Sequence, residues 1–365
     1  METKMLVHGE QRTSIWVDND HRVWIIDQRW LPHEVVFTEL TSLDDFYHSI
    51  KDMWVRGAPL IGVTAAFGIA KYMEIDNSDS GISQAYTQLM KARPTAVNLR
   101  TGLDFVCSKL KQYPKGKRAK LGFEAALKLW HLEISISKQI GRHGGELIKD
   151  MYFKKKRPIN ILTHCNAGWL ATVDWGTATA PMYWAAHNNI PIHVFVDETR
   201  PRNQGAQLTA WELGENKVSH DLIVDNAGGY LMQIGKVDMV VVGTDRTTAD
   251  GDVCNKIGTY LKALAAKDNN VPFYVALPST TIDWTINDGI KDIEIENRSE
   301  DEIHFVQGIN SKGKIDVVRI SPEKTPALNP SFDVTPAKLI TGLITEFGNI
   351  KATGDSLLSL KNVST

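Results

Sequence analysis

Hydrophobic residues follow one kind of spacing before about residue 154 and another kind after it. Near the start, two short runs of β-branched and aromatic residues, Ile15–Val17 and Val23–Ile26, flank the polar segment Asp18–Asp20. Such runs on either side of a turn-forming segment predict strands, so we expect a β-meander here. The residues that follow, up to about residue 150, show the three- and four-residue spacing of apolar positions that indicates helices.

Several helices are predicted in this first part. One spans Ser42–Val55, where Ser42 and Asp45 stand at the spacing of a capping box. Another begins at Pro59, a residue favoured in the first helical position, and the small residues after it, such as Gly62, permit close packing against a neighbour. The predicted ranges are 42–55, 59–73, a helix after residue 94, and about 117–150.

From residue 159 onward, short apolar runs alternate with helical segments. Runs of this kind predict a parallel sheet that is covered by helices on both faces, as in a doubly wound, Rossmann-like fold. The runs are Ile159–Thr163, Ile192–Val196, Leu222–Val224, Met239–Val242 and Phe273–Leu277.

The basic segment Lys154–Pro158 marks the change of pattern. It predicts a solvated connection before a strand, because it is short and lacks the interleaved aromatic residues of a nucleic-acid or phosphate patch, which is the alternative. We therefore expect an α/β protein with two domains. Residues 1–153 would form a small, mostly helical N-terminal domain with a β-meander, and residues 154–365 a Rossmann-like domain with a doubly wound parallel sheet.

Composition narrows the class of protein. The 365 residues include 41 Lys and Arg and 43 Asp and Glu, so a net charge of −2 provides no field for binding nucleic acid or an anionic membrane. The longest uncharged stretch, Trp175–Val196, contains prolines and asparagines and cannot span a bilayer as one apolar helix. The start, Met1–Lys4, does not lead into a signal peptide. We expect a soluble, cytoplasmic protein with neither nucleic acid nor membrane as a partner.

The cysteines point to reduced thiols. The three of them, Cys107, Cys165 and Cys254, are an odd number and are widely spaced, without a C-x-x-C pair. This pattern supports neither a disulfide framework nor a structural zinc site, so we expect no metal.

Polar residues concentrate where three of the predicted strands end. These segments are His164–Gly168, Asp197–Gly205 and Gly243–Lys256, and they bring thiols, carboxylates, amides and cations. Ligands of doubly wound sheets bind at the carboxyl ends of the strands, which makes this edge the predicted site.

Cys165 and Asp245 are the candidates for chemistry at this edge. Cys165 follows His164, but adjacent residues of an extended chain point to opposite faces, so the Cys–His dyad of a cysteine hydrolase is not favoured. The alternatives for Cys165 are a functional thiol and an inert buried residue. Asp245 directly follows a strand and would enter a partly desolvated pocket, where burial raises a carboxyl pKa and suits a proton donor. Its alternative role is the N-cap of a following helix.

The segment Arg56–Pro59 predicts an anion site at the start of a helix. Pro59 would place the amides of Gly57 and Ala58 at the positive end of the helix dipole, and the guanidinium of Arg56 suits phosphate. A Walker-type NTPase is excluded, because Val63 stands where a P-loop requires lysine. No G-x-G-x-x-G follows a strand, so the fingerprint of a nicotinamide site is also missing.

With these segments the sequence resembles the methylthioribose-1-phosphate isomerase family, which is itself similar to the regulatory subunits of the exchange factor for translation initiation factor 2. The motifs occur in the same order over nearly the whole chain. The matching stretches are Arg56–Pro59, Arg93–Leu99, Thr163–Gly168, Asp197–Pro201, Gln204–Ala206, Leu208–Leu213, Gly251–Val253, Asn255–Tyr260 and Phe332–Pro336.

The resemblance implies an aldose–ketose isomerase that converts 5-methylthioribose 1-phosphate, a small phosphosugar, to 5-methylthioribulose 1-phosphate in methionine salvage. It also implies a homodimer that uses no metal and no organic cofactor. The catalytic pair of the family falls on Asp245 and Cys165. The substrate-binding positions fall on Arg56, Gly57, Ala58, Arg93, Gln204, Asn255 and Lys256.

The implied chemistry suits these residues. Phosphate on the anomeric oxygen prevents the sugar from opening as a free aldose does, so an acid must protonate the ring oxygen. Hydrogen must then move from C2 to C1, by proton transfer or by a hydride shift. We expect Asp245 to act as the general acid/base, and Cys165 to assist proton movement or to stabilise the transition state.

Two alternatives remain at this point. Arg202 and Asn203 stand where many members of the family have apolar or aromatic residues, which leaves open a 5-deoxyribose 1-phosphate isomerase with a smaller C5 pocket. A non-catalytic regulatory subunit of the exchange-factor type would keep the fold and the anion pocket without the acid. An enzyme is favoured by the joint presence of Cys165, Asp245, Asn255 and Lys256.

Overall fold

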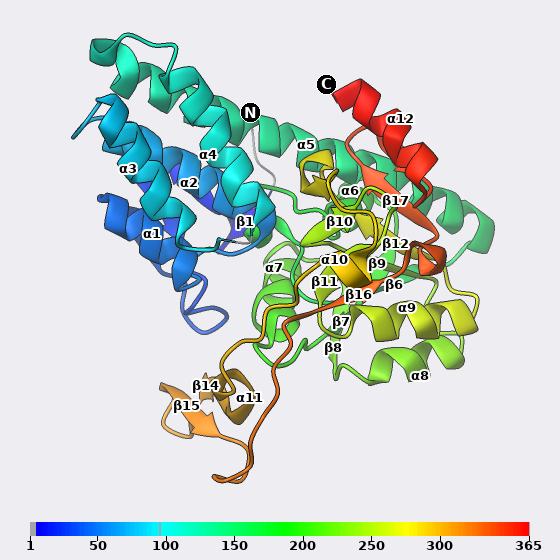
Figure 1. Ribbon diagram of the computed structural model, residues 1–365. Helices are drawn as coiled ribbons and strands as arrows, with labels where there is room; N and C mark the ends of the chain where they lie inside the picture. Colours follow the sequence, from blue (N-terminus) through cyan, green and yellow to red (C-terminus); the bar gives the residue numbers. More distant parts are fainter. Residues whose placement is uncertain (1–4, 95, 365) are drawn as a thin grey trace.

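The computed structural model describes residues 5–94 and 96–364, and it is an α/β protein (Figure 1). Thr95, within the predicted Arg93–Leu99 stretch, and the predicted absence of a signal peptide at Met1–Lys4 lie outside these described residues. The short strands β1 (Leu6–Val7) and β2 (Glu10–Gln11) come first. An antiparallel meander follows, made of β3 (Ile15–Val17), β4 (Val23–Ile26) and β5 (Phe37–Leu40). Both strands predicted for the meander are confirmed.

The helical part follows the meander. It comprises α1 (Leu43–Lys51), α2 (Ala58–Tyr72), α3 (Asp79–Met90), α4 (Val97–Leu110), the short 3-10 helix η1 (Lys115–Lys117) and α5 (Arg118–Lys155). α1 has the predicted capping box between Ser42 and Asp45, but it ends at Lys51 rather than at residue 55, and Met53 takes a left-handed conformation with a φ of 56°. α3 is a helix that the apolar spacing did not predict, and its signal is Ser78, whose hydroxyl caps the first turn.

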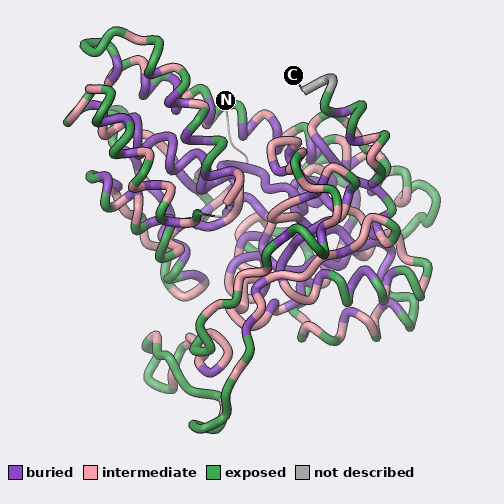
Figure 2. The backbone as a smooth tube through the Cα atoms, viewed as in Figure 1, coloured by how far each residue is buried: buried purple, intermediate pink, exposed green. Residues whose placement is uncertain are grey.

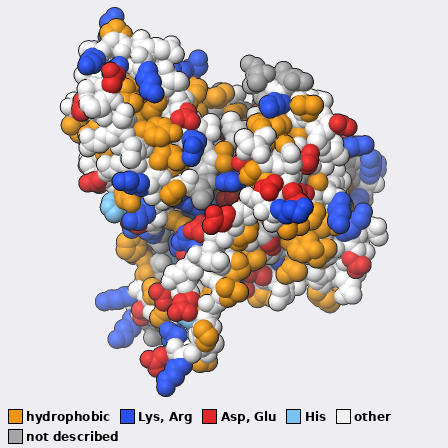
Figure 3. Space-filling view, in the orientation of Figure 1, with side chains coloured by type: hydrophobic (Ala, Val, Ile, Leu, Met, Phe, Trp, Pro, Cys, Tyr) orange, Lys and Arg blue, Asp and Glu red, His pale blue; other side chains and the backbone are white. Residues whose placement is uncertain are grey.

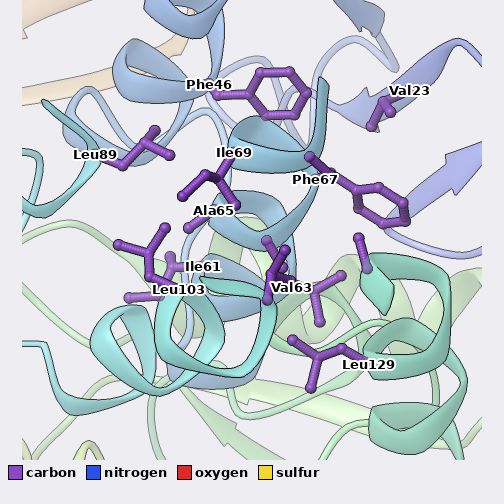
Figure 4. Packing of buried hydrophobic residues seen from close by; sticks show 14 of the residues in the cluster. Val23, Phe46, Ile61, Val63, Ala65, Phe67, Ile69, Leu89, Leu103 and Leu129 are labelled. Carbon is purple, nitrogen blue, oxygen red and sulfur yellow. The ribbon is translucent and has the colours of Figure 1, made fainter. Parts of the chain in front are cut away.

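α2 lies at the centre of this part and is buried along most of its length (Figures 2 and 4). It begins at Ala58 with Gly57 as its N-cap, so Pro59 occupies the second helical position rather than the predicted first. At its crossing with α4, a Cβ on Gly102 would lie 2.2 Å from the carbonyl oxygen of Gly62. The small residues therefore allow the predicted close packing, and this packing fixes where α2 starts.

The second part holds a seven-stranded sheet, and five of its strands follow the predicted apolar runs within two residues, whereas the last two along the chain were not predicted. In spatial order the strands are β8 (His220–Ile223), β7 (Ile192–Asp197), β6 (Ile159–Thr163), β9 (Met239–Val242), β12 (Phe273–Ala276), β17 (Gly342–Thr345) and β18 (Gly348–Ile350). Neighbouring strands are parallel except β17 and β18. The order of the six parallel strands, counted along the chain, is the 3-2-1-4-5-6 of Rossmann folds. The predicted doubly wound sheet is confirmed.

Helices cover both faces of this sheet (Figure 1). α5, α6 (Ala180–His187) and α7 (Ala210–Glu215) pack on one face, and α8 (Ala227–Gln233), α9 (Thr259–Asp268) and α12 (Gly354–Ser364) pack on the other. Successive residues of β9 alternate between the two layers, with Val241 in the first core and Val240 and Val242 in the second. Burial on both faces explains why the strands have continuous apolar runs rather than an alternating pattern.

Smaller elements lie outside the seven-stranded sheet, and the apolar pattern predicts none of them. A four-stranded sheet orders β13 (Ile282–Asp283), β10 (Arg246–Thr248), β11 (Val253–Lys256) and β16 (Phe332–Thr335). The hairpin of β14 (Phe305–Ile309) and β15 (Ile315–Arg319), preceded by α11 (Asp301–His304), projects from the body in the lower part of Figure 1. The short helices are η2 (Trp169–Ala171), the π-helical η3 (Gly205–Thr209), η4 (Ser279–Thr281), α10 (Gly289–Asp292) and η5 (Ala337–Leu339).

α5 crosses the predicted domain boundary after residue 153. It packs against α2 and α4 and also against α6 and β17, so one helix serves both parts, and the division into two domains stays a prediction. Its last turn includes Lys155, so the predicted solvated connection is partly helical. Lys155 and Arg157 pair with the buried carboxylate of Asp238 at 2.8 and 2.7 Å. Neither α5 nor any other helix among the described residues is long and apolar enough to cross a membrane.

Candidate active site

One cavity gathers the residues that the sequence singled out. It is bounded by the start of α2, by the loops after β6, β7 and β9, and by residues of β11 and β16, and it encloses about 740 Å³ up to its open mouth. Asn255 does not line it; this residue is buried behind the wall, where its Nδ2 donates to Thr259 Oγ1 at 3.0 Å. The other eight predicted site residues line the cavity: Arg56, Gly57, Ala58, Arg93, Cys165, Gln204, Asp245 and Lys256.

The topology of the sheet explains why Cys165 and Asp245 meet. β6 and β9 are hydrogen-bonded neighbours, and the strand order reverses between them. Their following connections leave on opposite faces, which opens a crevice at the carboxyl ends of these two strands. Cys165 comes shortly after β6 and Asp245 shortly after β9, so each enters the crevice from its own side.

The backbone of Cys165 is held in an unusual conformation. Its φ is 67°, and the φ of Thr199, at the end of the neighbouring β7, is 62°. Left-handed conformations are uncommon for residues other than glycine, and for a β-branched residue they indicate strain that the surroundings must hold. The Cys165 amide donates to Thr199 Oγ1 at 2.8 Å, and its carbonyl accepts from Thr209 Oγ1 at 2.7 Å. The loop is therefore fixed on both sides of the thiol.

The thiol of Cys165 is a proton donor rather than a thiolate in this environment. Burial raises the pKa of Cys165, although the cations Arg56 and Lys256 lower it. Its Sγ lies 3.5 Å from Gln204 Oε1, which accepts a hydrogen bond from the thiol. A protonated thiol does not suit the nucleophile of a cysteine hydrolase.

His164 serves the fold and does not pair with Cys165. Its Nδ1 lies 2.8 Å from Asp197 Oδ2 and its Nε2 lies 2.8 Å from the carbonyl oxygen of Ile257. His164, Asp197 and Asp225 come close enough together to offer ligands to a metal ion. However, Lys262 Nζ lies 3.0 Å from Asp197 Oδ2 and also donates to the Asp225 carbonyl, so a side-chain cation already occupies this cluster.

Arg56 and Lys256 are cations in poorly solvated positions. Arg56 is 8% exposed, and its Nη1 donates to Asn166 Oδ1 at 2.8 Å while its Nη2 donates to the Asn166 carbonyl. Lys256 is also 8% exposed, with its Nζ 4.7 Å from the centroid of the Phe332 ring. Burial lowers the pKa of both side chains, against the effect of acidic groups across the cavity. Two desolvated cations that line one cavity suit an anionic ligand.

Gly57 lets the start of α2 reach this wall. Its φ is 99°, and a Cβ at this position would lie 2.2 Å from the carbonyl oxygen of Ala171. Only glycine meets both conditions. The first amides of α2, including that of Ala58, therefore lie at the cavity with no helical partner of their own.

Asp245 is half-buried at the opposite side of the crevice. Its amide donates to the Cys254 carbonyl at 2.9 Å, which ties it to the small sheet. The strand β10 follows it directly, so the alternative role as the N-cap of a helix is wrong. Its carboxyl group shares the cavity with the thiol of Cys165.

The cavity is also lined by charged residues that were not predicted as site residues, among them Arg202 and Arg298. Arg298 and Arg202 both donate to Glu302, Arg298 through Nε at 2.9 Å and Arg202 through Nη1 at 3.0 Å. Burial raises the pKa of Glu302, but the hydrogen bonds from these arginines lower it to about 2. Arg93 lies 4.0 Å from Glu296 on the same side. Arg202 had a signal, as a departure from the family pattern, whereas the segment that carries Arg298 has no periodic pattern.

The whole chain is similar to known proteins in sequence and in fold. The profile described as Initiation factor 2 subunit family matches residues 54–352. A protein named methylthioribose-1-phosphate isomerase from Rhizobium meliloti (strain 1021) is 58% identical over 359 residues, which cover 98% of this chain and 99% of that protein. The crystal structure of 5-methylthioribose 1-phosphate isomerase from Pyrococcus horikoshii OT3 is 36% identical, with a TM-score of 0.84 over 97% of both chains. That of the translation initiation factor eIF-2B, subunit delta, from A. fulgidus is also 36% identical, with a TM-score of 0.80 over 96% of this chain and 100% of that one.

Proposed function

The chain belongs to the Initiation factor 2 subunit family, and we propose that it is an aldose–ketose isomerase acting on 5-methylthioribose 1-phosphate. The observation that carries this proposal is the single cavity that Cys165 and Asp245, from the ends of adjacent strands, share with Arg56 and Lys256. A relative of the same length and of that name, 58% identical, supports the substrate and the reaction. The product would be 5-methylthioribulose 1-phosphate, a step of methionine salvage.

The phosphate is proposed to bind at the start of α2. The guanidinium of Arg56 and the ammonium of Lys256 are desolvated, and a phosphate dianion would offset their charges. The amides after Gly57 would donate to the same group, at the positive end of the helix dipole. Arg93 and Gln204 are proposed to contact the sugar or the phosphate from the neighbouring walls, while Asn255, behind the wall, is proposed to fix the strand that carries Lys256.

Asp245 and Cys165 are proposed to move hydrogen. Protonation of the ring oxygen breaks its bond to C1 and opens the ring, with the phosphate still on C1. Removal of a proton from C2 and its return at C1, or a hydride shift between these carbons, then leaves a protonated carbonyl at C2. Loss of the proton on this oxygen to the acid/base gives the ketose and restores the acid. Asp245 acts as the acid/base, and the protonated thiol of Cys165 donates a proton or stabilises the developing charge.

Turnover of the purified protein tests this proposal. Incubation with 5-methylthioribose 1-phosphate should produce the ketose, followed by carbon NMR. Asp245→Asn should lower turnover by about 10²–10⁴-fold while substrate binding stays measurable by calorimetry. Asp250→Asn, an exposed carboxylate in the following loop, is the matched control and should leave turnover unchanged. Turnover near that of the wild type in Asp245→Asn would contradict the assigned role.

The same assay separates two other functions. A 5-deoxyribose 1-phosphate isomerase would show the higher kcat/KM with the deoxy sugar, and one missing group of this size changes binding by about 1–3 kcal/mol. Arg202 lines the cavity at a position where many family members have an apolar or aromatic residue, which is the reason to test this alternative. The chain is 36% identical both to the solved isomerase and to the eIF-2B subunit, so a regulatory role is the second alternative. The absence of ketose from both sugars would favour it.

A homodimer is also proposed, with β8, α8 and α9 as the contact face. Seven exposed large hydrophobic residues lie on these elements or next to them, and Figure 3 shows hydrophobic side chains gathered over α8 and α9. Patches of this kind on a protein surface often mark interaction sites. They are Leu222, Val224, Tyr230, Ile234, Tyr260, Leu261 and Leu264.

The mass in solution tests the dimer. Light scattering should give twice the chain mass of 40.7 kDa. Leu261→Glu should shift the mass toward one chain, because Leu261 is 58% exposed on the proposed face. Leu358→Glu is the matched control, since that leucine is equally exposed on α12. A monomeric wild type would rule the dimer out. A cytoplasmic location stays a prediction.

A further inference from the structure

Glu212 is a buried acid that the proposed chemistry does not use. It lies on α7, its side chain is 0% exposed, and no ion pair is formed by it among the described residues. Its Oε2 accepts from Asn166 Nδ2 at 3.2 Å and from the Leu170 amide at 3.3 Å, and its Oε1 accepts from the Tyr183 hydroxyl at 3.1 Å. Burial raises the pKa of Glu212 to about 7, although these hydrogen bonds lower it. A carboxyl in such a costly position calls for a specific role.

The carboxyl group of Glu212 packs directly against the loop that follows β6. A Cβ on Gly168 would lie 1.4 Å from Glu212 Oε1, so the loop can approach the acid this closely only because residue 168 is glycine. The same loop carries Cys165 and Asn166 into the cavity. Glu212 is therefore in position to set the geometry of this loop.

Asn166 links Glu212 to the anion site. Its Nδ2 faces two acceptors, Glu212 Oε2 and Thr209 Oγ1, the latter at 3.1 Å. The Thr209 hydroxyl has already donated its hydrogen to the Cys165 carbonyl, so it can only accept from the amide. The side-chain oxygen of Asn166 must then point the other way, where it accepts from Arg56 Nη1 at 2.8 Å.

We propose that Glu212 is a positioning residue for the phosphate site, which holds the Asn166 amide in the orientation that presents its oxygen to Arg56. This inference rests on the proposed function, since it assigns Arg56 to the substrate phosphate. Without an acceptor at residue 212, only Thr209 Oγ1 still accepts from the Asn166 NH₂ group, so the amide is held less firmly. In the turned orientation the NH₂ group faces the guanidinium, and two donors then oppose each other. Arg56 then loses the hydrogen bond from its Nη1 and keeps only the one from Nη2 to the Asn166 carbonyl, so the guanidinium is less firmly oriented toward the phosphate.

Three variants at residue 212 separate this role from a merely structural one. Glu212→Met removes the acceptor at similar length, and Glu212→Asp keeps the charge but withdraws it by one methylene. Both should raise KM by about 10- to 100-fold with a smaller change in kcat, as expected for a lost hydrogen bond to a charged group. Glu212→Gln can keep an oxygen toward Asn166 and its NH₂ toward Tyr183, so its KM should stay within about threefold of wild type. Glu215→Gln, at a partly exposed glutamate of the same helix, is the control and should not change KM.

Inorganic phosphate provides a second measurement that does not need turnover. Its dissociation constant, measured by calorimetry at pH 8, should rise in Glu212→Met and Glu212→Asp in parallel with KM and remain near wild type in Glu212→Gln. If the wild type makes no ketose, the proposed function fails, but the phosphate constants still decide the role of Glu212. Unchanged phosphate binding in a folded Glu212→Asp, or equal losses in Glu212→Asp and Glu212→Gln, overturns the inference.

Discussion

Glu133 allows a quantitative test of how this fold tolerates a buried acid. It lies in α5, is 5% exposed, and its Oε2 has no hydrogen-bond partner among the described residues. Burial, and then the nearby charge of Glu346, raise the pKa of Glu133 from 4.5 to about 7. Between these values the folded protein binds more protons than the unfolded chain, so its stability falls as the pH rises from about 4.5 to about 7. Below that window the group has no effect, and above it the destabilisation is complete.

The size of the effect follows from the two pKa values. The difference between 4.5 and about 7 corresponds to about 3 kcal/mol at 1.36 kcal/mol per pKa unit. Glu133→Gln removes the ionisation, so it should raise the free energy of unfolding at pH 8 by about 1–3 kcal/mol relative to its effect at pH 4.5. For a chain of this length the gain corresponds to a few degrees in Tm.

Urea and thermal unfolding, followed by circular dichroism at pH 4.5 and pH 8, measure this difference. Glu124→Gln is the matched control, because Glu124 is exposed on the same helix and should show no pH-dependent change. An effect of Glu133→Gln that is equal at the two pH values, or a larger loss of stability at pH 8, would refute the reasoning.

Three further predictions concern other parts of the molecule. Iodoacetamide should modify Cys165 slowly at pH 7 and faster as the pH rises, because burial raises the pKa of this thiol, and substrate should protect it; peptide mass spectrometry measures both effects. Gly102→Ala should destabilise the chain by about 1–3 kcal/mol through overpacking, while Gly116→Ala, with open space around it, should not; urea unfolding compares the two. Glu302→Gln should raise KM by about 10-fold with a smaller change in kcat, because Arg298 loses a charged partner on the cavity wall, and steady-state kinetics at pH 7 would show it.

Much of the fold could be predicted from the apolar pattern, because apolar residues occupy the positions that each helix or strand buries. The β9 run lies between two helical layers, and its unbroken Val240–Val242 predicts a strand that is buried on both faces. α3 was missed because its buried positions are few and its start depends on the hydroxyl of Ser78. The small sheet that includes β11 was missed for a different reason. β10 and β11 are short and pair with each other locally, but β13 and β16 join them from later parts of the chain, and that pairing depends on tertiary contacts.

The position of the candidate site could be predicted better than its contacts. The apolar runs predicted that Cys165 and Asp245 lie at the same edge of the sheet, and both line the cavity there. The motif around Arg56 also lines this cavity, and its binding of an anion stays a prediction. No spacing rule connects residue 298 to the cavity, because the segment before the β14–β15 hairpin meets the other cavity residues only in the folded chain. The orientation of Asn166 was equally out of reach, since it depends on which acceptors surround the amide. The roles of these residues in catalysis stay predictions.

Several locally unfavourable features, of backbone conformation and of burial, lie around the loop that follows β6. Cys165 and Thr199 take left-handed conformations, and a π-helix carries Thr209 to the Cys165 carbonyl. Glu212 is a buried acid that forms no ion pair with any residue that the structure describes. Each of these features destabilises the fold by itself. Together they satisfy one another's hydrogen bonds, and these bonds hold the backbone at the thiol and the guanidinium of Arg56 in one arrangement. A site preorganised in this way gains its transition-state stabilisation without reorganising during the reaction. We therefore expect substitutions within this network to affect substrate affinity and turnover more than substitutions of equal size elsewhere in the core.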